Sequence, residues 1–421
     1  MARKLPAAPP LTVMLDTAPP TPAPGALAGL RVLDLSRVLA GPLCTQMLAD
    51  HGADVIKVEP PSGDETRTLG PPFDAQGTAA YYLALNRGKR AMALDLSRDE
   101  GREVLLRLLQ DSDVLVENFL PGTMERWGMG FEAVLAPRFP RLVYCSISGF
   151  GADGPLGGQP GYDAVLQAMC GLMSINGEAA TGATRVGVPV VDHLTGYTAM
   201  SGILMALLAR QRTGRGQRVE ATLFDTALSL LVPHASNWMC SGQTPALMGS
   251  AHPNIAAYDK FHCADGEIFL GIINDGQFRR FCEHLGLSGL LADARFATNT
   301  LRLQHRGELR GTIEARLSIL ARETLCSELM RLGVPVGPVN SVPQAFEQAH
   351  AQHRGMCVQK GDYRGVGLPV KLSQTPGRAG RPPPAFGQHT DEILQQAGFD
   401  AEACDRLRAS GALPHKRRSA S

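Results

Sequence analysis

LRVLDLSRVLAGPLCTQMLADHGADVIKVE, residues 30–59, contains a complete strand–helix–strand unit. Short apolar runs at its two ends, RVLDL (31–35) and DVIKVE (54–59), are typical of buried strands. Between them, Pro42 stands at a favourable first helical position, and Gly52 closes the helical pattern. Two strands joined by a helix of this length usually pair in parallel, so the unit predicts a βαβ crossover.

The same alternation continues beyond this unit. Further strands are predicted at Ala91–Leu96, Val114–Val116 and Leu142–Ile147, and a helix is predicted within 101–110. Strands that alternate with helices over this distance indicate an α/β fold with a doubly wound, Rossmann-like parallel sheet.

The second half of the chain has a different pattern. A Gly/Pro-rich stretch follows Gly151, and a long helix is predicted around Leu194–Arg212. Near Lys260 a strand pair followed by several helices indicates a smaller α+β domain. The predicted organisation is a disordered Pro/Ala-rich extension (1–27), a large α/β domain (28–222), a linker helix (223–246), the small α+β domain (247–350), a return segment that completes the large domain (351–412) and a basic tail (413–421).

Composition excludes several classes of function. The 421 residues include 41 basic and 40 acidic side chains, for a net charge of +1, so no electrostatic footprint for nucleic acid or an anionic membrane is expected. No apolar run reaches the roughly 18–20 residues that a membrane helix needs. Nine dispersed cysteines without a C-x-x-C pair indicate reduced thiols, and hence a cytoplasmic protein.

One motif resembles a dinucleotide-binding fingerprint, but the residues that follow it exclude that interpretation. Gly149–Gly154 matches G-x-G-x-x-G after a predicted strand, but the next residues, PLGGQP (155–160), cannot open the helix that a pyrophosphate site needs. The eleven histidines show no metal-ligand spacing, so no metal site is expected. Without such groups, catalysis must rely on acid–base or covalent side-chain chemistry.

Asp192, in VPVVDHLTG (188–196), is the carboxylate best placed for such chemistry. It follows an apolar run and immediately precedes the long helix, where its charge would face the positive end of the helix dipole. An N-cap aspartate would occupy the same position. The two interpretations are compatible, because a carboxylate held at a helix start between apolar walls is positioned and partly desolvated.

An ordered set of motifs resembles the family III CoA-transferases, also called CaiB/BaiF, the group of formyl-CoA transferase, carnitine CoA-transferase and α-methylacyl-CoA racemase. The resemblance runs from about Ala28 to FGQHTDEIL (386–394). The motifs that carry it are the 30–59 unit, PPSGDETR (60–67), NRGKRAMALDL (86–96), DVLVENFLPGTMERWGM (113–129), LVYCSISGFGADGP (142–155), GYDAVLQAMCGLM (161–173) and the block from VPVVDHLTG to RVEATLFD (188–225).

The resemblance implies that Asp192 attacks an acyl-CoA thioester. It also implies coenzyme A as a substrate, with no permanently bound cofactor, small carboxylic acids as partners, and two subunits interlocked as linked rings. HPNIAAYDKF (252–261) replaces the tetraglycine loop of formyl-CoA transferase. Together with NDGQF (274–278), it is more similar to members that act on C4–C6 dicarboxylates, with succinyl-CoA as donor.

Positions that match CoA contacts of the family follow from the same resemblance. They are Val38, Leu39, Ala40, Leu94, Asp95, Asn118, Phe119, Leu120, Arg126, Gly161, Tyr162 and Asp163. Leu39 stands where the transferases often have glutamine, and Pro60 stands where some relatives have a phosphate-binding arginine. We therefore expect Arg67, Lys89 or Arg90 to supply the phosphate contact.

Two other functions stay open at this point. The racemase branch uses a histidine at the position of Tyr162 and a glutamate at that of His262, so two of its three proton-transfer residues are missing here. A non-catalytic CoA-binding protein is compatible with Leu39 and Pro60. Arg185 is the local cation that could meet a second carboxylate on the acceptor.

Overall fold

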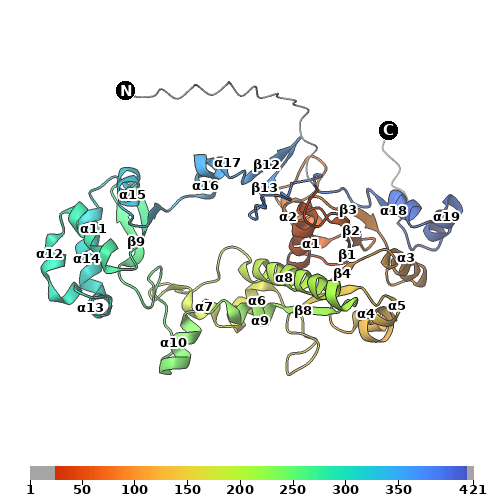
Figure 1. Ribbon diagram of the computed structural model, residues 1–421, viewed down its shortest axis with the longest axis horizontal. Helices are drawn as coiled ribbons and strands as arrows, with labels where there is room; N and C mark the ends of the chain where they lie inside the picture. Colours follow the sequence, from red (N-terminus) through yellow and green to blue (C-terminus); the bar gives the residue numbers. More distant parts are fainter. Residues whose placement is uncertain (1–23, 415–421) are drawn as a thin grey trace, which may run out of the picture.

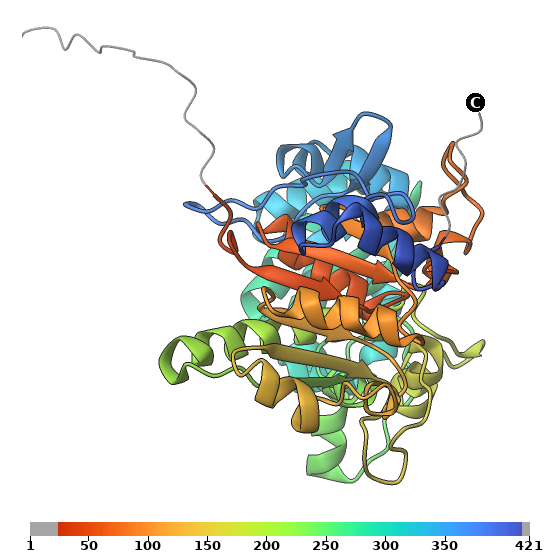
Figure 2. The same ribbon diagram turned by 90° about the vertical axis from the view of Figure 1, so that its right-hand side faces the viewer.

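A six-stranded, all-parallel sheet forms the centre of the larger part of the protein in the computed structural model, which describes residues 24–414 (Figures 1 and 2). The strand order is β3-β2-β1-β4-β5-β8. The bounds are β1 (Arg31–Asp34), β2 (Asp54–Glu59), β3 (Arg90–Ala93), β4 (Val114–Glu117), β5 (Val143–Ser148) and β8 (Arg218–Thr222). The predicted parallel α/β sheet is thus confirmed, although its third strand is shorter than expected.

Helices cover both faces of this sheet because successive side chains of a strand point to opposite faces. Val32 packs into the cluster formed with α1 and α8, while Leu33 packs into the cluster formed with α3, α18 and α19. The helix bounds in this part are α1 (Ala40–Asp50), α2 (Ala80–Leu85), α3 (Asp99–Leu109), α4 (Thr123–Arg126), α5 (Ala136–Arg138), α6 (Asp163–Met169), α7 (Leu172–Ile175), α8 (Val190–Thr213), α9 (Leu223–Ser229), α10 (His234–Ser241), α18 (Thr390–Gln396) and α19 (Ala401–Ala409).

The long helix α8 begins earlier than its sequence predicts. Its first residue is Val190 and its N-cap is Pro189, so Asp192 is the third helical residue and not the cap. The helix packs along α1 and beside β8, and it ends at Gly214, whose φ of 71° is a left-handed conformation that suits glycine. The carboxylate is consequently fixed on a rigid element and not on a loop.

A second, smaller group of elements has its own apolar core around Phe261, Ile268 and Phe281. Its antiparallel sheet, in the order β11-β10-β9, contains the predicted strand pair and a third strand, β11, which follows the helices of this group in the chain. The bounds are β9 (Tyr258–Cys263), β10 (Gly266–Gly271), β11 (Val336–Pro338), α11 (Asp275–Leu285), α12 (Ser288–Ala292), α13 (Asn299–Gln304), α14 (Arg306–Leu317) and α15 (Arg322–Arg331).

Two separate stretches of chain cross between the two groups of elements. One contains α9 and α10, and the other contains α16 (Val342–Glu347), α17 (Ala349–His353), β12 (Cys357–Lys360) and β13 (Tyr363–Val366); the two run far apart in Figure 1. The second stretch leads back to the large sheet, where Ala91 of β3 exchanges hydrogen bonds with His389. Segments far apart in sequence therefore meet at one sheet edge.

Parts of the predicted extension and tail lie outside the described residues, which begin at residue 24 and end at residue 414. The few described residues of the extension are in contact with the large sheet domain. The Leu27 backbone N–H donates to the His51 carbonyl at 2.9 Å, and Gly25 lies against the same carbonyl. Within the described range, no helix is both long and apolar enough to cross a bilayer.

Candidate active site

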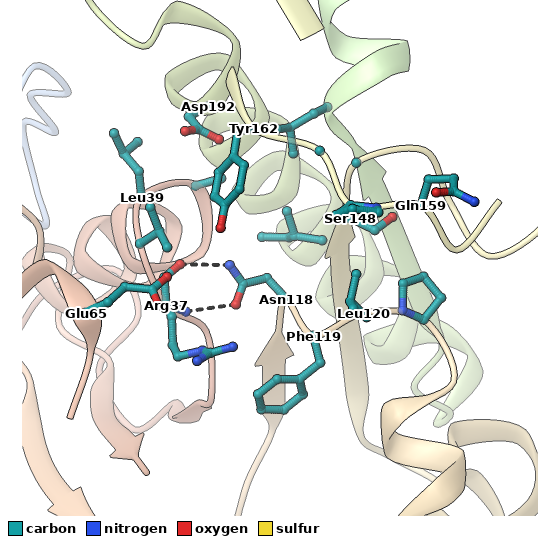
Figure 3. Close-up of a pocket in the computed structure, with 18 residues that line it drawn as sticks. Arg37, Leu39, Glu65, Asn118, Phe119, Leu120, Ser148, Gln159, Tyr162 and Asp192 are labelled. Carbon is teal, nitrogen blue, oxygen red and sulfur yellow. Dashed lines mark hydrogen bonds between the residues drawn. The ribbon is translucent and has the colours of Figure 1, made fainter. Parts of the chain in front are cut away.

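A cavity of about 280 Å³ opens where the carboxyl ends of β1, β4 and β5 meet. The strand order reverses direction between β1 and β4, and such switch points are where doubly wound sheets bind ligands. The segments that follow these three strands supply much of the wall, and Figure 3 shows Asp192 and Tyr162 closing one end. The lining residues are Arg37, Val38, Leu39, Ala40, Glu65, Asn118, Phe119, Leu120, Pro121, Ile147, Ser148, Gly149, Gln159, Pro160, Gly161, Tyr162, Asp192 and Leu223.

Asp192 presents a free carboxylate to this cavity. Its side chain makes no hydrogen bond or ion pair with any residue that the structure describes, and it is only partly buried. Burial raises the pKa of Asp192 to about 7, and the nearby charge of Asp163 adds to the rise. A carboxylate with no competing partner, poised to ionise near neutral pH, is suited to nucleophilic or acid–base chemistry.

Asp163 holds the backbone of Asp192 from behind. Its Oδ2 accepts the backbone N–H groups of Val191 at 2.8 Å and Asp192 at 3.1 Å, while Oδ1 accepts from Gln167 Nε2 at 2.6 Å. Two N–H groups that α8 cannot satisfy internally are therefore capped by a carboxylate of α6. Asp163, a predicted CoA contact, supports the first turn of α8 in this structure, and its side chain is not among those that line the cavity.

Two tyrosines lie near the carboxylate. Tyr162, a predicted CoA contact, is 65% exposed and lines the cavity. Tyr81, which the sequence did not single out, is close enough that burial, followed by the charges of Asp192 and Asp163, raises its pKa to about 12. Its hydroxyl therefore stays protonated at neutral pH and can donate a hydrogen bond.

The turn before α1 forms the opposite wall. Val38 has a φ of 67°, a strained conformation for a β-branched residue, which costs roughly 1–3 kcal/mol. Asn118 clamps this turn, because Oδ1 accepts the Arg37 N–H at 2.8 Å and Nδ2 donates to the Arg37 carbonyl at 2.7 Å (Figure 3). Strain held by such a clamp indicates a turn whose shape serves the cavity.

A second cavity of about 350 Å³ adjoins the first and shares Arg37, Phe119 and Leu120 with it. Leu94 and Asp95, two further expected contacts, lie in its wall. The remaining lining is mostly apolar and comprises Leu35, Val58, Pro60, Leu96, Ser97, Thr123 and Trp127.

Four cations predicted to contact CoA do not reach either cavity. Lys89 is fully buried, and its Nζ donates to Asp34 Oδ2 at 2.9 Å. Burial lowers the pKa of Lys89 to about 8, with the Asp34 charge opposing that fall. Arg67 donates two hydrogen bonds to the Glu59 carboxylate. Arg90 forms ion pairs with Asp54 and Glu392. Arg126 is exposed, and its guanidinium donates to Thr123 Oγ1.

These placements give the predicted phosphate contact by Arg67, Lys89 or Arg90 no geometric support. A buried charge needs an opposite charge nearby, and each of these three cations forms an ion pair with a carboxylate of the sheet domain. The sequence around these three cations gave no sign of their carboxylate partners.

Two further residues considered from sequence lie outside the cavity. His262 is an exposed residue of β9 whose Nδ1 lies 2.8 Å from Glu314 Oε1. The Arg185 guanidinium donates to the carbonyls of Val186 and Gly187. No histidine is among the described residues that line the Asp192 cavity, so the second base of a racemase has no counterpart in this wall.

Sequence reasoning missed Tyr81, Glu65, Ser148, Gln159 and Arg37. Glu65, Ser148 and Arg37 lie inside motifs quoted for the resemblance, so their motif membership was a signal. Tyr81 stands in a plain apolar helix and gave none.

Comparison with known proteins identifies the relatives of this chain. Residues 27–390 match the model of CoA-transferase family III. The succinate–glutarate CoA-transferase of Agrobacterium fabrum is 42% identical over 381 residues, which cover 88% of this chain and 95% of that protein. The succinyl-CoA:mesaconate CoA-transferase of Haloarcula marismortui is 38% identical, covering 89% of this chain and 97% of its own. A CaiB/BaiF family crystal structure from Brucella suis is 40% identical and superposes with a TM-score of 0.80, covering 89% of this chain and all of that one.

Proposed function

The chain belongs to CoA-transferase family III, and we propose that it transfers coenzyme A from succinyl-CoA to a small dicarboxylic acid through covalent intermediates on Asp192. That the protein is a CoA-transferase follows from its relatives. The donor, the acceptor class and the mechanism are the proposal. Its central support is the unpaired Asp192 carboxylate at the closed end of the cavity.

Succinyl-CoA is supported by the names of relatives over nearly the whole chain. The Agrobacterium fabrum and Haloarcula marismortui proteins are named for succinate or succinyl-CoA paired with glutarate and mesaconate, and a mouse protein, 36% identical over 92% of this chain, is named succinyl-CoA:glutarate CoA-transferase. All three acceptor names are C5 dicarboxylates, in agreement with the class that 252–261 and 274–278 suggest.

Four acyl exchanges complete the reaction. The Asp192 carboxylate attacks the thioester carbonyl and displaces CoA thiolate, leaving a mixed anhydride between Asp192 and the donor acid. The thiolate then attacks the aspartyl carbonyl of this anhydride. The donor acid leaves as a carboxylate, and an aspartyl-CoA thioester remains on Asp192. The acceptor carboxylate attacks that thioester and releases the thiolate again. Finally the thiolate attacks the acceptor acyl carbonyl, which gives the new acyl-CoA and restores Asp192.

Each step needs a positioned carboxylate and donors for the developing oxyanion. Asp163 fixes the backbone at Asp192 through two hydrogen bonds. Ala40 lines the cavity as the first residue of α1, where backbone N–H groups lack partners within the helix. Tyr81, whose hydroxyl stays protonated at neutral pH, lies within electrostatic reach of the Asp192 carboxyl.

The test is exchange of CoA by the protein and by Asp192→Asn. We expect succinyl-CoA and glutarate or mesaconate to yield the new CoA ester, detected by mass spectrometry. The amide side chain of the variant cannot form an anhydride, so turnover should fall by at least about 10³-fold while CoA affinity changes only a few-fold. With acyl-CoA present, hydroxylamine should attack the activated carbonyl of Asp192 and release CoA, which leaves a hydroxamate at residue 192 in the unaltered protein only. Normal exchange by Asp192→Asn contradicts the covalent mechanism.

We also propose that the protein assembles as an interlocked homodimer. We propose that residues 28–222 and 351–412 form the large domain and 247–350 the small one, with the two crossing stretches of Figure 1 enclosing a partner chain. Large apolar side chains on these stretches and on α8 are exposed, as expected for a buried interface: Val232, Trp238, Met239, Val342, Met205 and Leu208. The nine cysteines, all free thiols, support a cytoplasmic location.

A further inference from the structure

Arg37 is the single lysine or arginine among the described residues that line the two adjoining cavities. It lies in the wall of both, in the turn that Asn118 clamps. In Figure 3 its guanidinium extends beside Phe119, on the far side of Asn118 from Asp192. The cation therefore occupies the junction where one cavity passes into the other.

The guanidinium has no anionic partner. Within the part of the chain that the structure describes, it forms no ion pair or hydrogen bond, and its Nε is buried without an acceptor. It lies over the face of Phe119, 5.9 Å from the ring centroid. A buried guanidinium nitrogen left unsatisfied is costly, so this arrangement is typical of a site completed by an anionic ligand.

The ligand of the proposed function carries its charge at a matching place. CoA is linear: the thiol ends pantetheine, a diphosphate follows, and adenosine with a 3′-phosphate forms the other end. With the thioester carbonyl at Asp192, pantetheine would occupy the first cavity. The mainly apolar second cavity, with Leu35, Val58 and Trp127 in its wall, would then receive the adenine. This placement would bring the diphosphate to the junction between the two cavities.

We propose that Arg37 binds the diphosphate of CoA and is the residue that supplies the phosphate contact missing at Pro60. This inference rests on the proposed function and extends it to a residue. The planar fork of a guanidinium suits bidentate contact with phosphate oxygens, and Phe119 holds the fork in place from one side. Among the described residues, no other lysine or arginine lines these two cavities, so no second cation of their walls can take its place.

The test compares three probes with Arg37→Met and a matched control. Titration calorimetry gives the Kd of CoA and of dephospho-CoA, which lacks the 3′-phosphate, and succinyl-pantetheine turnover gives kcat/KM for a substrate without phosphate. Arg37→Met should raise the Kd of CoA and dephospho-CoA by the same factor, about 10- to 100-fold. Its kcat/KM for succinyl-pantetheine should stay within about twofold, because that substrate offers no diphosphate. Arg138→Met removes an arginine that also lies over a phenylalanine, Phe139 at 5.5 Å, but lines neither cavity, and it should change nothing.

Four other results would contradict the assignment of Arg37 to the diphosphate. An increase in Kd for CoA but not for dephospho-CoA would place Arg37 at the 3′-phosphate and overturn the assignment. Equal losses with succinyl-pantetheine would show a structural role, and an unchanged Kd would show no role at all. If the unaltered protein bound no CoA, the proposed function would fail, and this assignment with it. Binding by the unaltered protein with no effect of Arg37→Met would remove this assignment alone.

Discussion

Asp163 Oδ2 accepts the backbone N–H of Asp192 at 3.1 Å and that of Val191 at 2.8 Å. The same carboxylate thus fixes the first turn of α8 and places a like charge near the Asp192 side chain, whose pKa it helps to raise. Position and protonation of the proposed nucleophile are coupled through one neighbouring group.

Asp163→Asn and Asp163→Ala should separate these two roles. The amide oxygen of the asparagine variant can still accept the two N–H groups but carries no charge, so the pKa of Asp192 falls and activity extends to lower pH. The alanine variant leaves both N–H groups without an acceptor, and kcat should drop about 10- to 100-fold as the carboxylate loses its position. Rates of both variants across pH provide the measurement. Asp400→Asn alters another capping aspartate, at α19, and should leave kcat unchanged. Equal pH midpoints for Asp163→Asn and the unaltered protein would contradict the coupling.

The rate of transfer should rise with pH through about 7. The pKa of Asp192 is raised to about 7, so below this pH the carboxyl is protonated and cannot attack a thioester. We expect kcat/KM, which reports the free enzyme, to fall about tenfold per pH unit on the acid side. Initial rates with succinyl-CoA between about pH 5.5 and 8.5 provide the check, with spontaneous thioester hydrolysis subtracted. A flat profile over this interval would show that Asp192 ionises elsewhere.

Asp192→Asn should stabilise the fold, and more so at high pH. Since the pKa of Asp192 is raised from 3.8 to about 7 by folding, the unfolded chain loses this proton first, and stability falls as pH rises between these values. The neutral amide of the variant carries no such penalty. The gain in unfolding free energy should be near zero at about pH 4 and on the order of 2–4 kcal/mol at pH 8. Urea unfolding at the two pH values measures it, and an equal gain at both would argue against the raised pKa.

Gly196→Ala should impair both packing and transfer. Gly196 lies one turn after Asp192, and an added Cβ would come 2.8 Å from the Ala40 carbonyl oxygen of α1. Since backbone atoms must move, we expect about 1–3 kcal/mol of lost stability. The accompanying shift of Asp192 should lower kcat by at least about tenfold. Gly311→Ala in α14, where an added Cβ meets nothing within 4 Å, should instead stabilise by up to about 1 kcal/mol. Calorimetry and exchange assays on both variants give the comparison, and full activity in Gly196→Ala would exclude this packing constraint.

The sequence by itself determined the alternation of strands and helices, because the apolar runs and turn residues that encode it lie within a few residues of one another. It also identified Asp192, since an isolated carboxylate at the start of an apolar helix is visible locally, and the ordered motifs identified the family. The sequence did not predict the exact start of α8. The carboxylate that accepts the N–H of Asp192 in the first turn belongs to Asp163, 29 residues earlier in the chain.

Only the tertiary structure decided which of the basic residues pair with carboxylates and which one lines the cavities. Lys89 and Arg37 look alike in the sequence, as basic residues beside a predicted strand. Folding buries Lys89 against Asp34, 55 residues away, whereas Arg37, at the junction of two cavities, pairs with no carboxylate of residues 24–414. The physical reason is that the electrostatic energy of a charge depends on the groups that surround it in space. Burial strengthens these interactions because it lowers the effective dielectric constant.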